Sequence, residues 1–259
     1  MDFPLGKVFY LSIIVRLVVI GINLKMNAQV LMLSSSRVGT EDYLQHALPM
    51  LNNFLPEITE LLFIPFAGVS VSWDDYTTKV QEALPDYQIK GIHQFSNASQ
   101  ALETAQAIVV GGGNTFNLLN ELYQQNLLET VKKHVSQGTP YVGWSAGSNI
   151  CGNSIRTTND MPIIQPPSFD ALNLVPFQLN PHYTDYQPPG HNGETRAQRI
   201  EEFCILNPMM PVIGIREGSA LLLQGDSLVL KGELDGVAFE GISQSVIKPD
   251  QNLSMYLEL

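Results

Sequence analysis

Short, continuous apolar runs alternate with longer amphipathic stretches over most of the chain. An uninterrupted apolar run is typical of a strand buried on both faces, whereas apolar residues three and four positions apart indicate a helix. The runs predict strands over 30–33, 61–65, 88–92, 107–110, 141–144 and 212–215. The stretches between them predict helices over 41–54 (capped by Thr40), 74–83, 115–123, 127–137 and 195–206. This order predicts βαβ units, and therefore an α/β fold with a mostly parallel sheet and helices on both faces.

The pattern changes after Gly214. Short apolar runs over 220–223, 227–230 and 236–239 are separated by Gly-Asp and Leu-Asp-Gly turns, which are typical of antiparallel hairpins. No Gly/Ser/Pro-rich linker divides the chain, so we expect a single domain over 26–259. Its ligands should bind at the carboxyl ends of the parallel strands.

The first 25 residues need a separate interpretation. They are mostly apolar, but Arg16 splits them into two blocks, and a central Arg costs about 2.5–3.5 kcal/mol on membrane-insertion scales. Met26 directly precedes the first predicted strand. We therefore expect residues 1–25 to be an N-terminal extension with Met26 as the physiological start; a weak membrane-associated leader is the alternative.

Composition and charge exclude several classes of protein. Of 259 residues, 44% are hydrophobic and 15% are charged, which predicts a folded core. Lys and Arg number 14 against 25 Asp and Glu, for a net charge of -11, which disfavours nucleic-acid binding. Two isolated cysteines, Cys151 and Cys204, indicate reduced thiols and no zinc site. We expect a cytoplasmic protein, monomeric or a small homo-oligomer, with no membrane partner, metal or cofactor.

The segment Gly143-Trp144-Ser145-Ala146-Gly147 has the pattern G-x-S-x-G. It follows one predicted strand and precedes a predicted helix, which is the context of a nucleophile elbow. In such a turn, small neighbours allow the backbone to close tightly and present the serine hydroxyl. The pattern therefore favours Ser145 as a nucleophile over a purely structural Gly/Ser turn.

A second glycine-rich segment, Gly111-Gly112-Gly113, follows the predicted strand 107–110. It matches neither nucleotide-binding glycine pattern. Glycines at a strand end leave backbone N–H groups uncovered, and an acyl-transfer site needs such donors for its oxyanion. We predict that the N–H groups of Gly113 and Ala146 form an oxyanion hole, with Asn114 beside it in the substrate site.

A serine nucleophile needs a base held at a fixed position. Of five histidines, His182 is favoured because it follows the apolar segment 174–179, whereas His191 lies in a loop rich in Pro and Gly and is expected to line the pocket. The third member of the triad stays open at this point. The candidates are Asp160, Asp170, Asp185 and Glu217; Glu217 follows a predicted strand, and Asp160 fits the Ser, Asp, His order of α/β-hydrolases.

From about Met26 onward, the chain resembles a family of serine peptidases that comprises peptidase E, an α-aspartyl dipeptidase, and the cyanophycinases. The resemblance includes the serine elbow, an Asn-Pro-His motif and a Gly-Glu-Thr-Arg motif. The matching stretches are 64–68, 73–76, 111–116, 143–149, 156–162, 169–174, 180–182 and 193–196.

The resemblance implies a flavodoxin-like sheet related to class I glutamine amidotransferases, and hydrolysis of small acidic dipeptides with an N-terminal L-aspartate. By motif it implies Ser145 as nucleophile and His182 as base. The family's third member corresponds to Glu217 or Asp160; we favour Glu217 and keep Asp160 as a site residue.

An anionic substrate on an acidic protein needs a local cation, and Arg suits a two-oxygen acceptor. Arg196 of the Gly-Glu-Thr-Arg motif is the preferred candidate, with Arg156 and His191 as competitors. Three alternative activities use the same Ser and His: a cyanophycinase-like peptidase, an isoaspartyl-type peptidase and an esterase.

Overall fold

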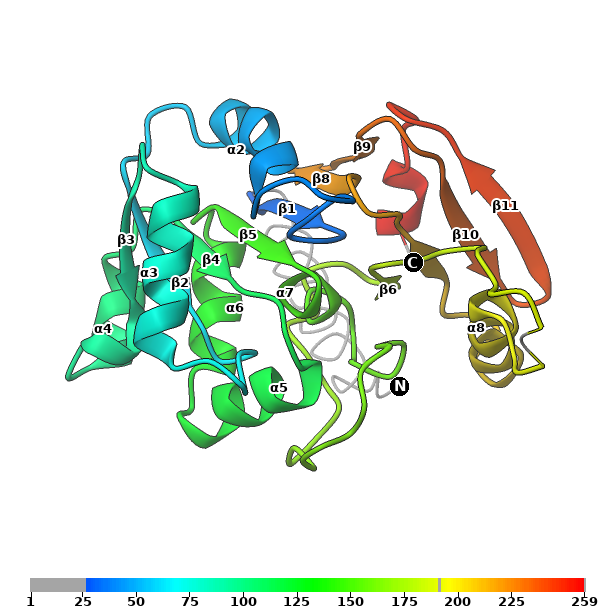
Figure 1. Ribbon diagram of the computed structural model, residues 1–259, viewed down its shortest axis with the longest axis horizontal. Coiled ribbons are helices and arrows are strands. Elements are labelled where there is room, and N and C mark those ends of the chain that lie inside the picture. The colour runs from blue at the N-terminus through cyan, green and yellow to red at the C-terminus, as the bar shows by residue number, and fades with distance from the viewer. Residues whose placement is uncertain (1–26, 191, 259) are drawn as a thin grey trace, which may run out of the picture.

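The computed structural model describes residues 27–190 and 192–258 and contains two β-sheets (Figure 1). The larger sheet has seven strands, of which the first five in spatial order are parallel and the last two antiparallel. In spatial order they are β3 (Gln88–Gly91), β2 (Glu60–Ile64), β4 (Ile108–Val110), β5 (Tyr141–Trp144), β1 (Gln29–Leu33), β8 (Ala220–Gln224) and β9 (Ser227–Lys231). The predicted mostly parallel sheet and C-terminal hairpin are confirmed.

Helices cover both faces of this sheet, which explains the continuous apolar runs. Leu31 and Leu33 of β1 pack on one face and Val30 and Met32 on the other. The first face is covered by α2 (Leu48–Phe54) and α3 (Trp73–Ala83). The second is covered by α4 (Ala98–Glu103), α5 (Thr115–Gln124), α6 (Leu128–Ser136) and α7 (Ala146–Asn149). Because neither face of β1 meets water, the strand has no polar alternation.

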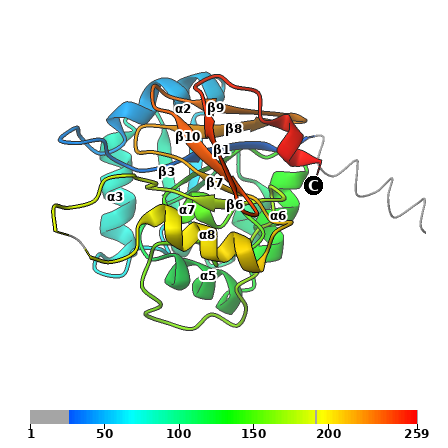
Figure 2. The same cartoon turned by 90° about the vertical axis from the view of Figure 1, so that its right-hand side faces the viewer.

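A second sheet of four strands lies beside the first and is covered by α8 (Arg196–Leu206) (Figure 2). Its spatial order is β11 (Ser243–Ile247), β10 (Gly236–Glu240), β7 (Val212–Gly214) and β6 (Gln178–Asn180). Our grouping of 212–215 with the strands of the main sheet was therefore wrong. This segment pairs in parallel with β6, a three-residue strand too short for its apolar pattern to identify.

The helix predicted over 41–54 also needs correction. Thr40 does not cap it: a 3₁₀ turn over Gln45–Ala47 comes first, and α2 begins at Leu48. Leu44 adopts a φ of 60°, which breaks any helix running through it. Pro49 lies in the first turn of α2, where backbone N–H groups have no partner within the helix, so the absence of an N–H on proline costs no hydrogen bond.

The carboxyl ends of three neighbouring strands, β4, β5 and β1, meet at one edge of the main sheet, which is where we expect ligands to bind. Across the described part of the chain, no helix combines the length and apolarity needed to cross a membrane. The proposed extension 1–25 and the start at Met26 lie outside the described residues.

Candidate active site

Ser145 occupies a sharp turn between β5 and α7. Its backbone, with φ 54° and ψ -111°, lies in a region that non-glycine residues rarely adopt. The flanking glycines are sterically required: a Cβ on Gly143 would lie 2.4 Å from the carbonyl oxygen of Gly147, and one on Gly147 would lie 2.2 Å from that of Val110. The turn therefore has the strained geometry of a nucleophile elbow.

His182 joins the serine to a carboxylate. Its Nε2 lies 2.9 Å from Ser145 Oγ, and its Nδ1 lies 2.7 Å from Glu217 Oε1. An ionised carboxylate only accepts hydrogen bonds, so this pairing favours a proton on Nδ1 and leaves the Nε2 lone pair for the serine hydroxyl. His182 and Glu217 follow the parallel strands β6 and β7 of the second sheet, so the two sheets together assemble this hydrogen-bonded chain.

Ser34, which the sequence analysis missed, anchors the histidine. It follows β1 directly and is fully buried. Its Oγ accepts a hydrogen bond from His182 N at 2.9 Å and donates one to the carbonyl of Ile215 at 2.8 Å. Ser34 thereby links the main sheet to the ends of β6 and β7. Its place at the end of a parallel strand, like that of Ser145, was the signal that could have identified it.

Of the four carboxylates considered for the imidazole, Glu217 is the one at hydrogen-bond distance from it. Asp160 Oδ2 instead accepts hydrogen bonds from the backbone N–H of Thr115 at 2.7 Å and from the hydroxyls of Thr115 and Thr158. Since Thr115 begins α5, Asp160 lies at the positive end of that helix dipole.

The other two candidates have different roles. Asp185 forms an ion pair with Arg216 and accepts a hydrogen bond from the hydroxyl of Tyr183. Asp170 lies opposite Ser154 in an isolated β-bridge. Neither contacts the imidazole of His182.

The glycine-rich segment supplies uncovered N–H groups beside the serine. Within the described residues, the N–H groups of Gly112 and Gly113 donate no backbone hydrogen bond. Gly113 has a φ of +139°, and a Cβ there would lie 2.2 Å from the carbonyl oxygen of Ala67. Tyr76 donates its hydroxyl to the Gly112 carbonyl at 2.9 Å. Because a trans peptide directs its N–H opposite to its C=O, this bond fixes the direction of the Gly113 N–H.

A small cavity of about 100 Å³ opens on one side of Ser145 and contains Arg196 and Asp160. The Nη1 atom of Arg196 is buried and has no hydrogen-bond partner among the described residues. Burial, with a smaller contribution from nearby Arg199, lowers the pKa of Arg196 from its usual value. An unpaired buried N–H group of a guanidinium is unfavourable, and a carboxylate bound in this cavity is the kind of acceptor that would suit it.

The remaining predicted substrate-site residues have different positions. Arg156 turns away from the cavity: its guanidinium bonds Ser154 and Asn207 and stacks over Phe203. Asn114 caps α5 through its Oδ1 and also lines a second cavity. His191 lies outside the described residues.

That second cavity, of about 470 Å³, also adjoins Ser145. Ser145 and His182 line both cavities. The larger one also contains Tyr43, Tyr76 and Lys79, none of which the sequence analysis singled out. A ligand bound across the serine would therefore extend into two chemically different compartments.

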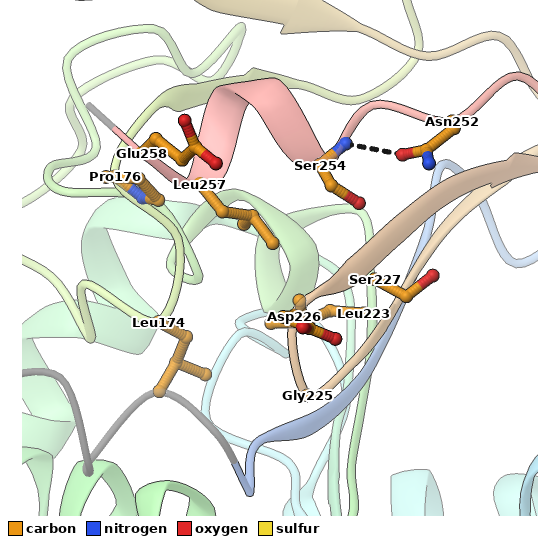
Figure 3. Close-up of a pocket in the computed structure, with 10 residues that line it drawn as sticks. All are labelled: Leu174, Pro176, Leu223, Gly225, Asp226, Ser227, Asn252, Ser254, Leu257 and Glu258. Carbon is orange, nitrogen blue, oxygen red and sulfur yellow. Dashed lines mark hydrogen bonds between the residues drawn. The ribbon is translucent and has the colours of Figure 1, made fainter.

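A cavity of about 640 Å³ lies elsewhere, between the β8–β9 turn and the C-terminal 3₁₀ helix (Ser254–Leu257) (Figure 3). Its lining mixes leucines with single polar groups such as Asn252, which accepts from the backbone N–H of Ser254 at 2.8 Å. Its described lining residues include neither a nucleophile paired with a base nor an Arg or Lys. In the described parts of the chain, no three His, Cys, Asp or Glu side chains are grouped as metal ligands.

Comparison with known proteins shows the family of the chain. The model of peptidase family S51 matches residues 30–231. Peptidase E of Shewanella denitrificans is 56% identical over 235 residues, which cover 90% of this chain and 100% of that protein. Peptidase E of Shewanella amazonensis is 54% identical with the same coverage.

Two solved structures share the fold. The putative peptidase E from Listeria monocytogenes superposes with a TM-score of 0.62 at 24% identity, covering 79% of this chain and 98% of that one. A peptidase from an acI-B1 actinobacterium superposes with a TM-score of 0.63 at 14% identity, covering 88% and 97%. They support the predicted flavodoxin-like α/β class. The matched family model and the identity to the Shewanella proteins establish that this chain is a member of peptidase family S51.

Proposed function

We propose that the protein is a serine dipeptidase that hydrolyses dipeptides with an N-terminal L-aspartate. One observation carries the proposal: a Ser145–His182–Glu217 hydrogen-bonded chain lies next to a small cavity lined by Arg196, whose Nη1 atom is buried without a partner among the described residues. The relatives named peptidase E support the same class.

The reaction begins with transfer of the serine proton. His182 Nε2 accepts the proton of Ser145 as Oγ attacks the carbonyl carbon of the peptide bond. Glu217, bound to Nδ1, holds the ring in the required tautomer and stabilises the imidazolium that forms. The N–H groups of Gly113 and Ala146 donate to the oxyanion of the tetrahedral intermediate.

The intermediate then collapses with cleavage of the C–N bond. The imidazolium returns its proton to the leaving nitrogen, and the second amino acid departs with a free amino group. The aspartyl group remains as an ester on Ser145. A water molecule, deprotonated by His182, attacks this ester, and the Ser145 oxygen recovers the proton as L-aspartate is released.

Specificity follows from the two charges in the small cavity. The guanidinium of Arg196 would pair with the side-chain carboxylate of the substrate aspartate, as planar two-oxygen recognition favours. Asp160 offers its second oxygen, since all the hydrogen bonds it accepts from described residues go to Oδ2. That oxygen is suited to the α-ammonium group, which every dipeptide substrate carries.

The test compares four substrates: Asp-Ala, its isoaspartyl isomer, Ala-Ala and a short-chain p-nitrophenyl ester. The proposal expects Asp-Ala to be hydrolysed at least about 10-fold faster in kcat/KM than Ala-Ala, since a charged hydrogen bond contributes about 1.5–3 kcal/mol. Activity should disappear in Ser145→Ala.

Other outcomes would contradict the proposal. Preference for the isoaspartyl isomer would favour the isoaspartyl-type alternative, and hydrolysis of the ester alone would favour an esterase. Full activity of Ser145→Ala on Asp-Ala would refute the serine mechanism.

A further inference from the structure

Lys79 presents a cation to the larger cavity without a carboxylate partner. It lies on α3, and its Nζ is 4.2 Å from the centroid of the Tyr43 ring. Within residues 27–190 and 192–258, the ion pairs of the structure do not include Lys79. What sets Lys79 apart from the other described lysines is that it lines the cavity beside Ser145.

The groups around Lys79 do not neutralise it. Asp75, one helical turn earlier, is not among the ion-pair partners of Lys79 in the described residues, and its carboxylate accepts a hydrogen bond from the hydroxyl of Ser72 at 2.7 Å. Tyr43 is a phenol whose pKa is raised well above its usual value, chiefly by burial and also by neighbouring Tyr76. The ring therefore stays neutral and supports the ammonium group through a cation–π contact.

The same side chains connect Lys79 to the reacting centre. The hydroxyls of Tyr43 and Tyr76 lie 3.1 Å apart, and Tyr76 donates to the carbonyl of Gly112. Tyr43, Tyr76, Lys79 and Ser145 all line the larger cavity. A group bound at Lys79 therefore shares a compartment with the bond that Ser145 attacks.

We infer that Lys79 binds the C-terminal carboxylate of the residue that leaves the scissile bond. The inference rests on the proposed function, which assigns the aspartyl residue to the small cavity and so leaves the larger one to the second residue. In a dipeptide that second residue carries the free carboxylate, whereas in a longer peptide an amide follows at this point. One cation here thus distinguishes dipeptides from longer chains, while the volume of about 470 Å³ leaves room for varied side chains.

The experiment measures kcat/KM for Asp-Ala and for its C-terminal amide, which lacks the carboxylate charge. Wild type should prefer Asp-Ala by about 10-fold or more, the effect of one charge-assisted hydrogen bond. Lys79→Met retains much of the side-chain length and should reduce this ratio to near one, mainly through a higher KM for Asp-Ala. Lys79→Arg should retain most of the preference. Lys133→Met, at an exposed position on α6, is the matched control and should keep the wild-type ratio.

The outcomes separate this inference from the proposed function. If wild type hydrolyses neither substrate, the proposed function itself is wrong. If it hydrolyses Asp-Ala and Lys79→Met keeps the full preference over the amide, Lys79 does not read the carboxylate. Hydrolysis of the amide by Lys79→Met also reports whether that variant is folded, so a lost ratio cannot be mistaken for a lost structure.

Discussion

Replacement of Arg196 by Met should separate substrate recognition from folding. Met preserves an unbranched side chain of good helix propensity at the first position of α8, but it removes the guanidinium. Without that group, kcat/KM for Asp-Ala should fall by about 10- to 100-fold, from the loss of a charged hydrogen bond of about 1.5–3 kcal/mol. Ala-Ala, which has no side-chain carboxylate, should be affected far less.

The same change should not destabilise the free enzyme. The Nη1 atom of Arg196 is buried without a partner, and burial lowers the pKa of the group, so the charged form is disfavoured in the folded state. A buried unsatisfied donor costs about 1–3 kcal/mol. If about 1 kcal/mol of this is recovered, Tm should rise by roughly 2–4 °C in a chain of this size.

The assay pairs thermal unfolding with kinetics on Asp-Ala and Ala-Ala. Arg199→Met is the matched control, because Arg199 is an exposed arginine of the same helix whose nearest carboxylate, Glu194, is 3.7 Å away. The control should keep the preference for aspartate. If Arg196→Met retains the preference for aspartate, Arg196 does not bind the aspartate side chain. If the Tm of this variant falls by several degrees, the guanidinium stabilises the fold. Either result refutes the reasoning.

Three further predictions follow from the site and the core. Tyr76→Phe should lower kcat on Asp-Ala by about 10-fold with little change in KM. The loss should be smaller than the roughly 10²–10³-fold lost when an oxyanion donor is removed, because the substitution only frees the Gly112–Gly113 peptide to rotate. An effect confined to KM would contradict this role. Glu217→Gln should lower kcat by about 10²-fold or more, measured by steady-state kinetics, while circular dichroism shows an intact fold. Near-wild-type activity of this variant would exclude Glu217 as the partner of His182. Cys151 and Cys204 are both buried, and burial raises the pKa of the Cys204 thiol to about 11. Titration with a disulfide reagent at pH 8 should therefore detect no thiol in the native protein and two after denaturation. Rapid reaction of the folded protein would contradict the burial of both thiols.

The elements best predicted from the sequence are those whose constraints are local. The elbow at Ser145 follows from strand context and from the steric need for small flanking residues, both readable over five positions. The prediction of a helix over 41–54 failed because Leu44 has a positive φ, and its N–H donates to the carbonyl of Ser36, outside the helical hydrogen-bond pattern. Helix propensity carries no information about such a contact.

The choice between Glu217 and Asp160 could not be made from the sequence for a related reason. Both follow plausible motifs, and the distinction depends on which sheet β7 joins. Glu217 reaches the imidazole because β7 pairs with β6, the strand that precedes His182. Local apolar patterns do not indicate which strands pair when the segments lie more than 30 residues apart. For the same reason Ser34, which links these strands to β1, was not predicted.

The geometry of the candidate site depends on the junction between the two sheets more than on either sheet alone. Ser145 and His182 both have positive φ values, 54° and 56°, which are costly for non-glycine residues. Such conformations persist only where the surroundings enforce them. For Ser145 the enforcement comes from the elbow within the main sheet, and for His182 from Ser34, whose hydroxyl bonds His182 and Ile215 together. Because each sheet holds one of the two strained residues, the 2.9 Å contact between Ser145 and His182 exists only when the sheets are joined correctly. The pairing of nucleophile and base is therefore a property of the complete fold.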